Sequence, residues 1–275
     1  MNNRIVKSFD RQCLLAKCDI EDVFWIINIH PSDHHLLGFT WNNCYYYDRC
    51  IPMGASSSCQ IFESFSCVLQ WIMEFKYKAA GMSHIIDDFL FVVPPKSNKC
   101  LQDLNAFLTL CPKIGISIKD EKTVLPTTVI TIYGIEVDSI QMECRLPLDK
   151  IQKINNLLYK VQHKKKISLR KLQSLIGLLN FACLVVCPGR AFLRRLIDHT
   201  KKVSSPCYLI RFPCEARADL QAWKMFMNGF NGKSIFLKDG WENSKLLTCT
   251  LMHQVMQVLL LCSAVGGLQS HGLTI

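Results

Sequence analysis

The spacing of hydrophobic positions changes along this chain, and the change predicts two kinds of structure. In the first part, short apolar runs bounded by turn-forming residues are typical of β-strands. Strands are expected at 14–19, 24–29, 36–41 and 44–47, with Asn42-Asn43 as the turn of a hairpin between the last two. From Ser56 apolar residues recur three and four positions apart, so a helix is expected to run from a serine-rich N-cap region, 56–58, toward Gly81.

Beyond this helix the chain returns to strands and then becomes helical. A hairpin at 83–93, a helix at 99–111 and an apolar run at 114–118 precede a β-like run at 129–137, interrupted by Gly134, and a strand at 143–146 that is expected to pair with it. After Pro147, helices are expected at 148–163, 168–183, 190–202 and 214–228. This order predicts an α+β fold, in which an antiparallel sheet packs on helices and a helical region follows.

Two adjacent carboxylates, Asp87 and Asp88, lie between the apolar runs of the expected 83–93 hairpin. Burying two negative charges in an apolar β segment is costly unless a cation meets them. A metal ion would compensate the charge, since carboxylate oxygens are good ligands for hard divalent cations. The alternative is an ordinary Asp-Asp turn at the tip of the hairpin.

A third carboxylate, Asp19, also ends an apolar strand, and the aromatic Phe24 follows five positions later. Carboxylates that converge from separate strands suit two-metal phosphoryl transfer, because paired ions stabilise both the attacking and the leaving oxygen. Between the acidic segments, Pro52-Met53-Gly54 forms a turn before the long helix. Its glycine would let a substrate approach the backbone closely.

Composition favours a polyanionic partner and a reducing compartment. The chain has 32 Lys and Arg against 22 Asp and Glu, a formal charge of +10, although a merely basic surface would give the same balance. Fifteen cysteines without an apolar N-terminal signal segment indicate reduced thiols in the cytoplasm or nucleus, not a secreted protein. The sequence contains no CxxC pair, so a zinc site is not expected. Residues 246–266 are apolar, but His253, Gln254 and Gln257 argue against a membrane helix.

The order of these segments resembles the palm of a reverse transcriptase. Its motifs A to E are matched in sequence by Asp19 with Phe24, the Pro-x-Gly turn, the Asp-Asp hairpin, Gly115-Ile116-Ser117-Ile118 with Lys122, and Tyr133-Gly134. More narrowly, strings over residues 13–245 are similar to the polymerase of DIRS-type, tyrosine-recombinase retrotransposons, among them HPSDHHLLGF, YYYDRCIPMGASSSCQIFESF, SHIIDDF, YGIEVDS and PGRAFLRRLID. The resemblance implies RNA-directed DNA polymerisation, in which a DNA primer 3′-hydroxyl attacks a deoxynucleoside triphosphate (dNTP) on an RNA template.

The resemblance also implies a role for each matching residue. Asp19, Asp87 and Asp88 would be catalytic and hold two Mg²⁺ ions, or Mn²⁺ in their place, with Asp88 the less direct ligand. Lys122 would protonate the pyrophosphate leaving group, or be one solvated lysine of a charged loop. The residues expected to bind the dNTP are Asp22, Val23, Phe24, Met53 and Gly54. Phe24 would exclude a 2′-hydroxyl, with an ordinary core position as the alternative for it and for Met53.

Template and primer would contact the palm and a basic helical region that fits a thumb. Tyr133 and Gly134 correspond to the primer grip. The basic residues expected to follow a nucleic-acid backbone are Lys164, Lys165, Lys166, Arg170, Lys171, Arg190, Arg194 and Arg195. For any one of them, a solvated basic face is the alternative.

The resemblance finally predicts missing parts. Residues 1–147 would be a palm with partial fingers, 148–245 a helical thumb and connection, and 246–275 an aberrant tail where an RNase H domain should start. A frameshift near Thr248 would explain the tail, because permitted codons read in another frame restore an RNase H-like string. We therefore expect weak or no activity from the fragment alone. The alternatives are a nucleic-acid-binding remnant that keeps the polymerase fold and a metal-dependent nuclease.

Overall fold

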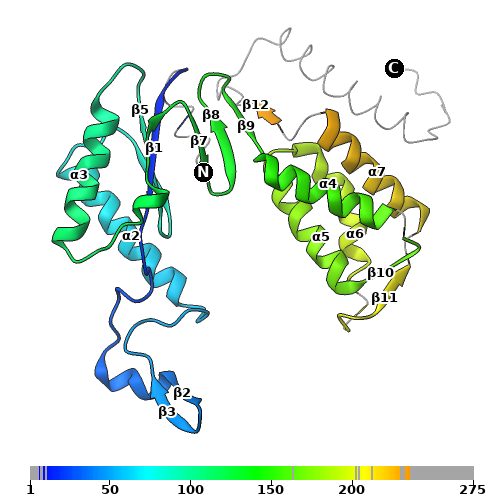
Figure 1. Ribbon diagram of the computed structural model, residues 1–275, viewed down its shortest axis with the longest axis horizontal. Helices are drawn as coiled ribbons and strands as arrows, with labels where there is room; N and C mark the ends of the chain where they lie inside the picture. The colour runs from blue at the N-terminus through cyan, green and yellow to red at the C-terminus, as the bar shows by residue number, and fades with distance from the viewer. Residues whose placement is uncertain are drawn as a thin grey trace, which may run out of the picture. The chain divides into compact units, whose positions relative to one another are not determined.

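The computed structural model describes residues 6, 9, 11–162, 164–201, 203, 205–211 and 213–229, together with the backbone of 233–235. They fall into two compact units, unit 1 (residues 1–142) and unit 2 (residues 143–275). Each unit mixes helices with antiparallel strand pairs (Figure 1). The expected α+β fold is therefore confirmed. The functional labels given to 1–147, 148–245 and 246–275 stay predictions.

Unit 1 is built on a four-stranded sheet in the order β4-β5-β1-β6, with antiparallel neighbours. Its strands are β1 (Leu14–Asp19), β4 (Met82–Ile85), β5 (Asp88–Val93) and β6 (Val124–Thr127). The predicted 83–93 hairpin is β4 and β5, which are joined by the two residues Ile86 and Asp87.

Two helices cover one face of this sheet. Side chains alternate along a strand, so Cys18 of β1 and its partner Phe89 of β5 point to the same face. Both are buried in one core with residues of α2 (Ser58–Phe75) and α3 (Lys99–Lys113). By the same alternation, the next pair, Asp19 and Asp88, belongs to the opposite face.

Helix α2 begins in the predicted region, but its cap differs from the expectation. Ser57 at the N-cap makes no side-chain capping bond. Instead, Ser58 Oγ donates a 2.7 Å hydrogen bond to the carbonyl oxygen of Pro52. This bond ties the start of the helix to the Pro-x-Gly turn.

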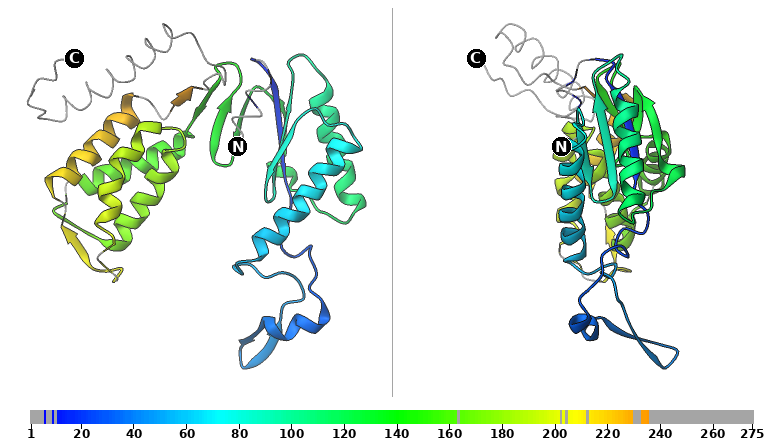
Figure 2. Two further views of the ribbon diagram at one scale, coloured as in Figure 1. Left: turned by 180° about the vertical axis from the view of Figure 1, so that it is seen from behind. Right: turned by 90° about the vertical axis from the view of Figure 1, so that its left-hand side faces the viewer.

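Two tight hairpins complete unit 1. The predicted Asn42-Asn43 hairpin joins β2 (Gly38–Trp41) to β3 (Cys44–Tyr47), and both asparagines have the positive φ that its turn requires, 49° and 59°. Figure 2 shows it in blue, at the end of unit 1 away from the sheet. The run at 129–137 forms β7 (Val129–Ile132) and β8 (Ile135–Asp138), and Gly134 lies in the turn between them.

Two apolar runs of unit 1 are irregular. The strand expected at 24–29 is wrong: these residues form turns, with an isolated bridge between Asn28 and Cys50. Apolar residues there pack against the core from an irregular backbone, so hydrophobicity alone mimicked a strand. The 3-10 helix η1 (Pro31–Leu37) then shortens the strand expected at 36–41. The run at 114–118 makes one isolated bridge, Ile20 to Ile118, before η2 (Asp120–Lys122).

Unit 2 is mostly helical. Its helices are α4 (Leu148–Gln162), α5 (Leu169–Ala182), η3 (Cys187–Phe192), α6 (Arg194–Asp198) and α7 (Cys214–Gly229). Two short antiparallel pairs join β9 (Glu143–Arg145) to β12 (Lys233–Ile235) and β10 (Lys166–Ser168) to β11 (Leu209–Arg211).

The helix expected at 190–202 is wrong in extent, because η3 and the short α6 replace it. Gly189 in η3 packs against the buried Trp223 so closely that an added Cβ would lie 2.3 Å from the ring. That close approach helps fix the course of the backbone near Gly189. The helical spacing of apolar residues did not predict it.

Among the described residues, no helix is long and apolar enough to cross a membrane. The apolar run at 246–266 and the predicted frameshifted tail lie outside the described residues.

Candidate catalytic carboxylate site

Strand pairing brings the three predicted carboxylates together. Asp19 ends β1 and lies directly opposite Asp88, the first residue of β5. The backbone N–H of Ile20 donates to the carbonyl oxygen of Asp87 at 3.1 Å, which fixes the turn beside the end of β1. Asp19 is 4% exposed, so one of the three carboxylates is buried. Residues 68 positions apart in sequence thus form one acidic cluster.

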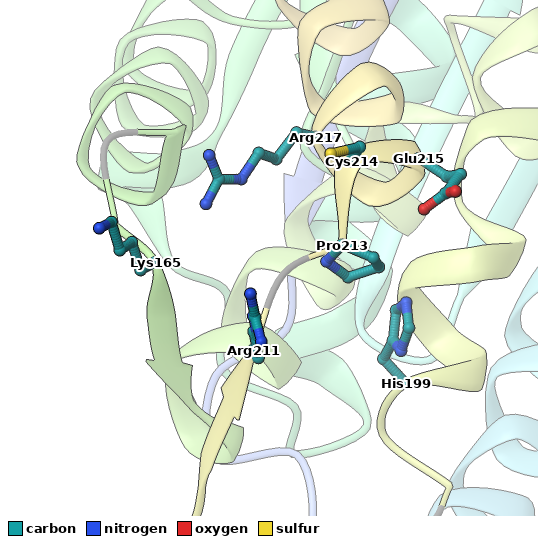
Figure 3. Close-up of a pocket in the computed structure, with 7 residues that line it drawn as sticks. All are labelled: Lys165, His199, Arg211, Pro213, Cys214, Glu215 and Arg217. Atoms are coloured by element: carbon teal, nitrogen blue, oxygen red, sulfur yellow. The ribbon is translucent and has the colours of Figure 1, made fainter.

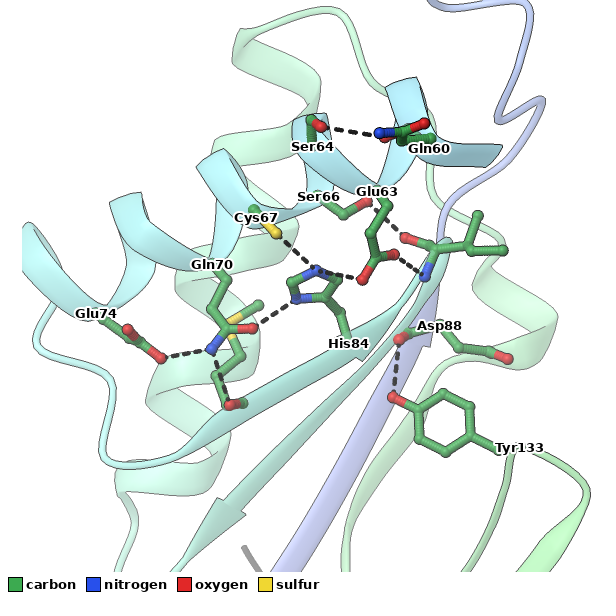
Figure 4. A network of polar contacts seen from close by, with 12 residues as sticks. Gln60, Glu63, Ser64, Ser66, Cys67, Gln70, Glu74, His84, Asp88 and Tyr133 are labelled. Carbon is green, nitrogen blue, oxygen red and sulfur yellow. Dashed lines mark hydrogen bonds and ion pairs between the residues drawn. The ribbon is translucent and has the colours of Figure 1, made fainter. Parts of the chain in front are cut away.

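The turn that carries Asp87 is strained and externally supported. Ile86 has φ 56°, a left-handed conformation that is unfavourable for a β-branched residue. Its N–H donates to Glu63 Oε2 at 2.8 Å, and its carbonyl oxygen accepts from Ser66 Oγ at 2.6 Å (Figure 4). Both partners belong to α2, so this helix holds the turn in shape.

Two lysines face the buried carboxylate. Lys122 Nζ lies 2.8 Å from Asp19 Oδ2, and Lys119 Nζ lies 3.8 Å from Oδ1. The hydrogen bond to Asp19 raises the pKa of Lys122 above its ordinary value, so the amine stays protonated. Among the described residues, Asp19 Oδ1 accepts no hydrogen bond although it is buried. That oxygen is available to a further cation.

Burial and repulsion between the carboxylates raise the pKa values of the other two, Asp87 and Asp88. Burial, followed by repulsion from Asp19 and Asp87, raises the pKa of Asp88 to about 6. Burial also raises the pKa of Asp87, and repulsion from Asp19 adds to it. A divalent cation bound here would reduce the repulsion among these carboxylates. The negative charge and the oxygen donors of the three carboxylates are compatible with a divalent cation.

The predicted primer-grip residues lie beside the acidic turn. Tyr133, at φ 52°, precedes Gly134, at φ 72°, in the turn between β7 and β8. The Tyr133 hydroxyl donates to the carbonyl oxygen of Asp88 at 3.2 Å (Figure 4). Burial raises the pKa of Tyr133, so its phenol remains a donor at neutral pH. This hydrogen bond ties the turn between β7 and β8 to the start of β5.

The predicted dNTP-binding residues lie on two loops. Asp22, exposed and at φ 50°, and Val23 begin the turn after β1. Phe24 is partly buried and meets Phe62 edge-on, with ring centroids 6.1 Å apart.

The second of these loops carries Met53 and Gly54. Met53 is 72% exposed, which excludes a core role for it. Gly54 has φ 92°, a conformation that favours glycine.

The predicted basic residues of unit 2 are all exposed: Lys164, Lys165, Lys166, Arg170, Lys171, Arg190, Arg194 and Arg195. Arg195 has a structural partner, because its Nε lies 3.0 Å from the buried carboxylate of Asp219.

Two further basic residues were missed from the sequence. Lys165, Arg211 and Arg217 line one open hollow of about 680 Å³ (Figure 3). Its other lining residues are His199, Pro213, Cys214 and Glu215. Arg211 reaches the lysine-rich segment because β11 pairs with β10. No local pattern in the sequence predicts that pairing.

No family model matches this chain. Among curated proteins, the genome polyproteins of two isolates of Petunia vein clearing virus, Shepherd and Hohn, are each 22% identical to it over 199 residues. Among solved structures, the foamy viral protease-reverse transcriptase in complex with an RNA/DNA hybrid matches 86% of this chain with a TM-score of 0.65 and 19% identity. The chain has a reverse transcriptase-like fold.

Two more foamy viral structures share this reverse transcriptase-like fold. The dRH form in complex with double-stranded DNA has a TM-score of 0.64, with 20% identity over 83% of this chain. The protease-reverse transcriptase in complex with double-stranded DNA has a TM-score of 0.62, with 20% identity over 89%. This chain spans 8% of the viral polyprotein and 29%, 38% and 47% of the three foamy viral chains.

Proposed function

We propose that this chain is an RNA-directed DNA polymerase domain that transfers nucleotides from dNTPs to a primer 3′-hydroxyl. The observation that carries the proposal is the convergence of Asp19, Asp87 and Asp88 within a reverse transcriptase-like fold. The foamy viral neighbours were solved with RNA/DNA hybrid or double-stranded DNA, which supports a nucleic-acid substrate here.

In this proposal, Asp19 and Asp87 would hold two Mg²⁺ ions, or Mn²⁺, and Asp88 completes the acidic cluster. Bound divalent ions would stabilise the negative charge that develops on the attacking and leaving oxygens. The primer 3′-hydroxyl loses its proton to solvent, its O3′ forms a bond to the α-phosphorus, and the bond from that phosphorus to pyrophosphate breaks. Lys122 Nζ, protonated and beside Asp19, is the group that gives a proton to the pyrophosphate.

The loops around the cluster position the dNTP. The backbone after β1, at Asp22 and Val23, faces the triphosphate, and the ring of Phe24 excludes a 2′-hydroxyl. Its edge-on contact with the buried Phe62 restrains the ring, as such a gate requires. The exposed Met53 and the adjacent Gly54 form the second wall.

Contacts to the primer and template come from residues on both units. Tyr133 and Gly134 contact the primer end, and the exposed lysines and arginines of unit 2 neutralise backbone phosphates. Within the proposal, the sequence strings assign the chain to a DIRS-type retrotransposon. A tyrosine recombinase gene in the neighbouring DNA is the expected companion.

Primer extension tests the proposal. The purified chain, an RNA template with a labelled DNA primer, dNTPs and Mg²⁺ should give at most weak extension, and any extension should depend on the template. Asp87→Asn should abolish it, because one ligand carboxylate is lost, while Asp33→Asn removes an exposed charge outside the proposed site and should not. Equal extension by wild type and Asp87→Asn would refute the proposed site.

The second candidate is a remnant that binds template-primer without catalysis. It is favoured by the exposed basic residues of unit 2, which do not depend on the acidic cluster. Binding that weakens steeply with salt, with no extension in Mg²⁺ or Mn²⁺, would select this candidate over the polymerase.

A further inference from the structure

A second group of metal-ligating side chains lies behind the acidic turn. Glu63 and Cys67 are four positions apart on α2, and His84 comes from β4. Their ligand atoms all lie within 4.8 Å of one another (Figure 4). His84 Nε2 is 3.6 Å from Cys67 Sγ and 3.5 Å from Glu63 Oε1. None of these residues belongs to the polymerase site proposed above.

Hydrogen bonds fix which nitrogen of His84 is free. Gln70 Nε2 donates to Glu74 Oε1 at 2.7 Å and to the carbonyl oxygen of Met82 at 3.2 Å. The amide oxygen of Gln70 must therefore face His84 Nδ1, which lies 2.5 Å away and donates to it. In the neutral imidazole, this leaves the lone pair of Nε2 directed at the thiol and the carboxylate.

The other two ligands are also prepared for a cation. Glu63 uses Oε2 to accept the N–H of Ile86, so its Oε1 remains toward His84. His84 Nε2 and Glu63 Oε1 lie 3.5 Å apart. Cys67 is exposed, so an ion could reach the group from solvent.

Two of the three separations between ligand atoms agree with tetrahedral zinc. Zinc bonds of about 2.3 Å to sulfur and about 2.0–2.1 Å to nitrogen or oxygen place neighbouring ligand atoms about 3.4–3.6 Å apart. The two observed separations are 3.6 and 3.5 Å. A thiolate and an imidazole favour Zn²⁺ over Mg²⁺, whereas the oxygen-only cluster of Asp19, Asp87 and Asp88 favours Mg²⁺.

We propose that Glu63, Cys67 and His84 form a binding site for one Zn²⁺ ion, with a fourth position open to water or an external ligand. Binding releases the thiol proton of Cys67 to solvent. Gln70 acts as a positioning residue, because its hydrogen bond orients the imidazole. Since Glu63 also accepts the N–H of Ile86, zinc would tie α2 to the turn formed by Ile86 and Asp87.

Zinc titration of the reduced full chain against a chromophoric chelator tests the site. Cys67→Ser removes the thiolate, and Cys59→Ser is the matched control because Cys59 is an exposed cysteine of the same helix. Wild type and the control should bind one Zn²⁺ with the same affinity, and Cys67→Ser, which loses a direct ligand, should weaken binding by more than the about 10-fold to 100-fold that loss of an outer-shell partner costs. With Co²⁺, wild type should show a thiolate charge-transfer absorption band that Cys67→Ser lacks.

Gln70→Ala separates a prepared site from adventitious cysteine binding. It leaves all three ligands in place and should weaken zinc binding by about 10-fold to 100-fold through loss of the second hydrogen bond on His84. Equal affinity and equal Co²⁺ spectra in Cys67→Ser and Cys59→Ser would overturn the proposal. Circular dichroism of each metal-free variant checks that the fold is kept.

Discussion

At the scale of single residues, Asp88 has a clear energetic consequence. Burial and the neighbouring carboxylates raise its pKa to about 6, above the ordinary value of 3.8. The unfolded chain ionises this group more readily than the folded chain does. The penalty is therefore absent well below pH 4, grows as the pH rises from about 4 to 6, and is complete above that.

Asp88→Asn should stabilise the metal-free protein at pH 7 and change little near pH 4. A shift of about two pKa units corresponds to about 3 kcal/mol, and solvent screening of this half-buried group reduces the expected gain to about 1–2 kcal/mol. Urea titrations of both proteins at the two pH values measure the gain. Asp22→Asn, at an exposed position, controls for loss of charge. A gain that is equal at pH 4 and pH 7 would contradict the assignment.

At the scale of elements, α6 and α7 are joined by one partly buried ion pair. Arg195 Nε lies 3.0 Å from Asp219 Oδ2, and the Asp219 side chain is 1% exposed. The preceding residue, Arg194, pairs instead with Asp198 at 3.4 Å on the surface. The adjacent Arg194 and Arg195 thus have different partners. The sequence had predicted a nucleic-acid contact for both.

Arg195→Ala should destabilise unit 2, because it leaves the buried Asp219 carboxylate without its cation. Loss of one partner of a buried pair costs about 3–5 kcal/mol, and the exposed arginine lowers the expectation to about 2 kcal/mol. Thermal unfolding followed by circular dichroism measures the loss. Arg194→Ala should leave the melting temperature essentially unchanged. Equal losses in the two variants would show that the Asp219 contact contributes nothing special.

Sequence patterns predicted elements where local chemistry decides the structure. Asn42-Asn43 predicted the turn of the β2–β3 hairpin, and the helical spacing of apolar residues predicted α2. Patterns failed where long-range packing decides, as in the irregular 24–29 segment and in η3, where Gly189 meets Trp223.

The same contrast between local and long-range interactions applies to the carboxylate cluster and to the proposed zinc site. Asp19, Asp87 and Asp88 were predicted because adjacent carboxylates in apolar strands are unusual. Glu63, Cys67 and His84 were not, because the absence of CxxC made zinc unlikely from sequence, and only strand β4 brings the histidine to α2.

At the scale of the whole molecule, the two units differ in the charged residues that they present. The chain carries +10, and exposed lysines and arginines are concentrated in the sequence of unit 2, whereas unit 1 presents a cluster of carboxylates. Phosphate binding releases counterions, so affinity for template-primer should fall steeply with salt.

Arg211→Ala combined with Arg217→Ala should weaken template-primer binding and lower the slope of log affinity against log salt by about 1 to 2. Both side chains line the basic hollow of unit 2. Fluorescence anisotropy at several salt concentrations measures the slope. Lys76→Ala with Lys113→Ala removes the same charge from exposed positions of unit 1 and should change the slope less. Equal slopes in the two double variants would exclude the hollow as a contact.

Direct Mn²⁺ binding tests whether Asp19, Asp87 and Asp88 hold divalent cations, as proposed. Electron paramagnetic resonance measures free Mn²⁺ in a titration of the zinc-free chain without nucleic acid. Wild type and Asp22→Asn should take up Mn²⁺ with the same affinity, and Asp87→Asn should bind at least ~10-fold more weakly because a ligand is lost. Identical Mn²⁺ binding by Asp87→Asn and wild type would contradict the claim.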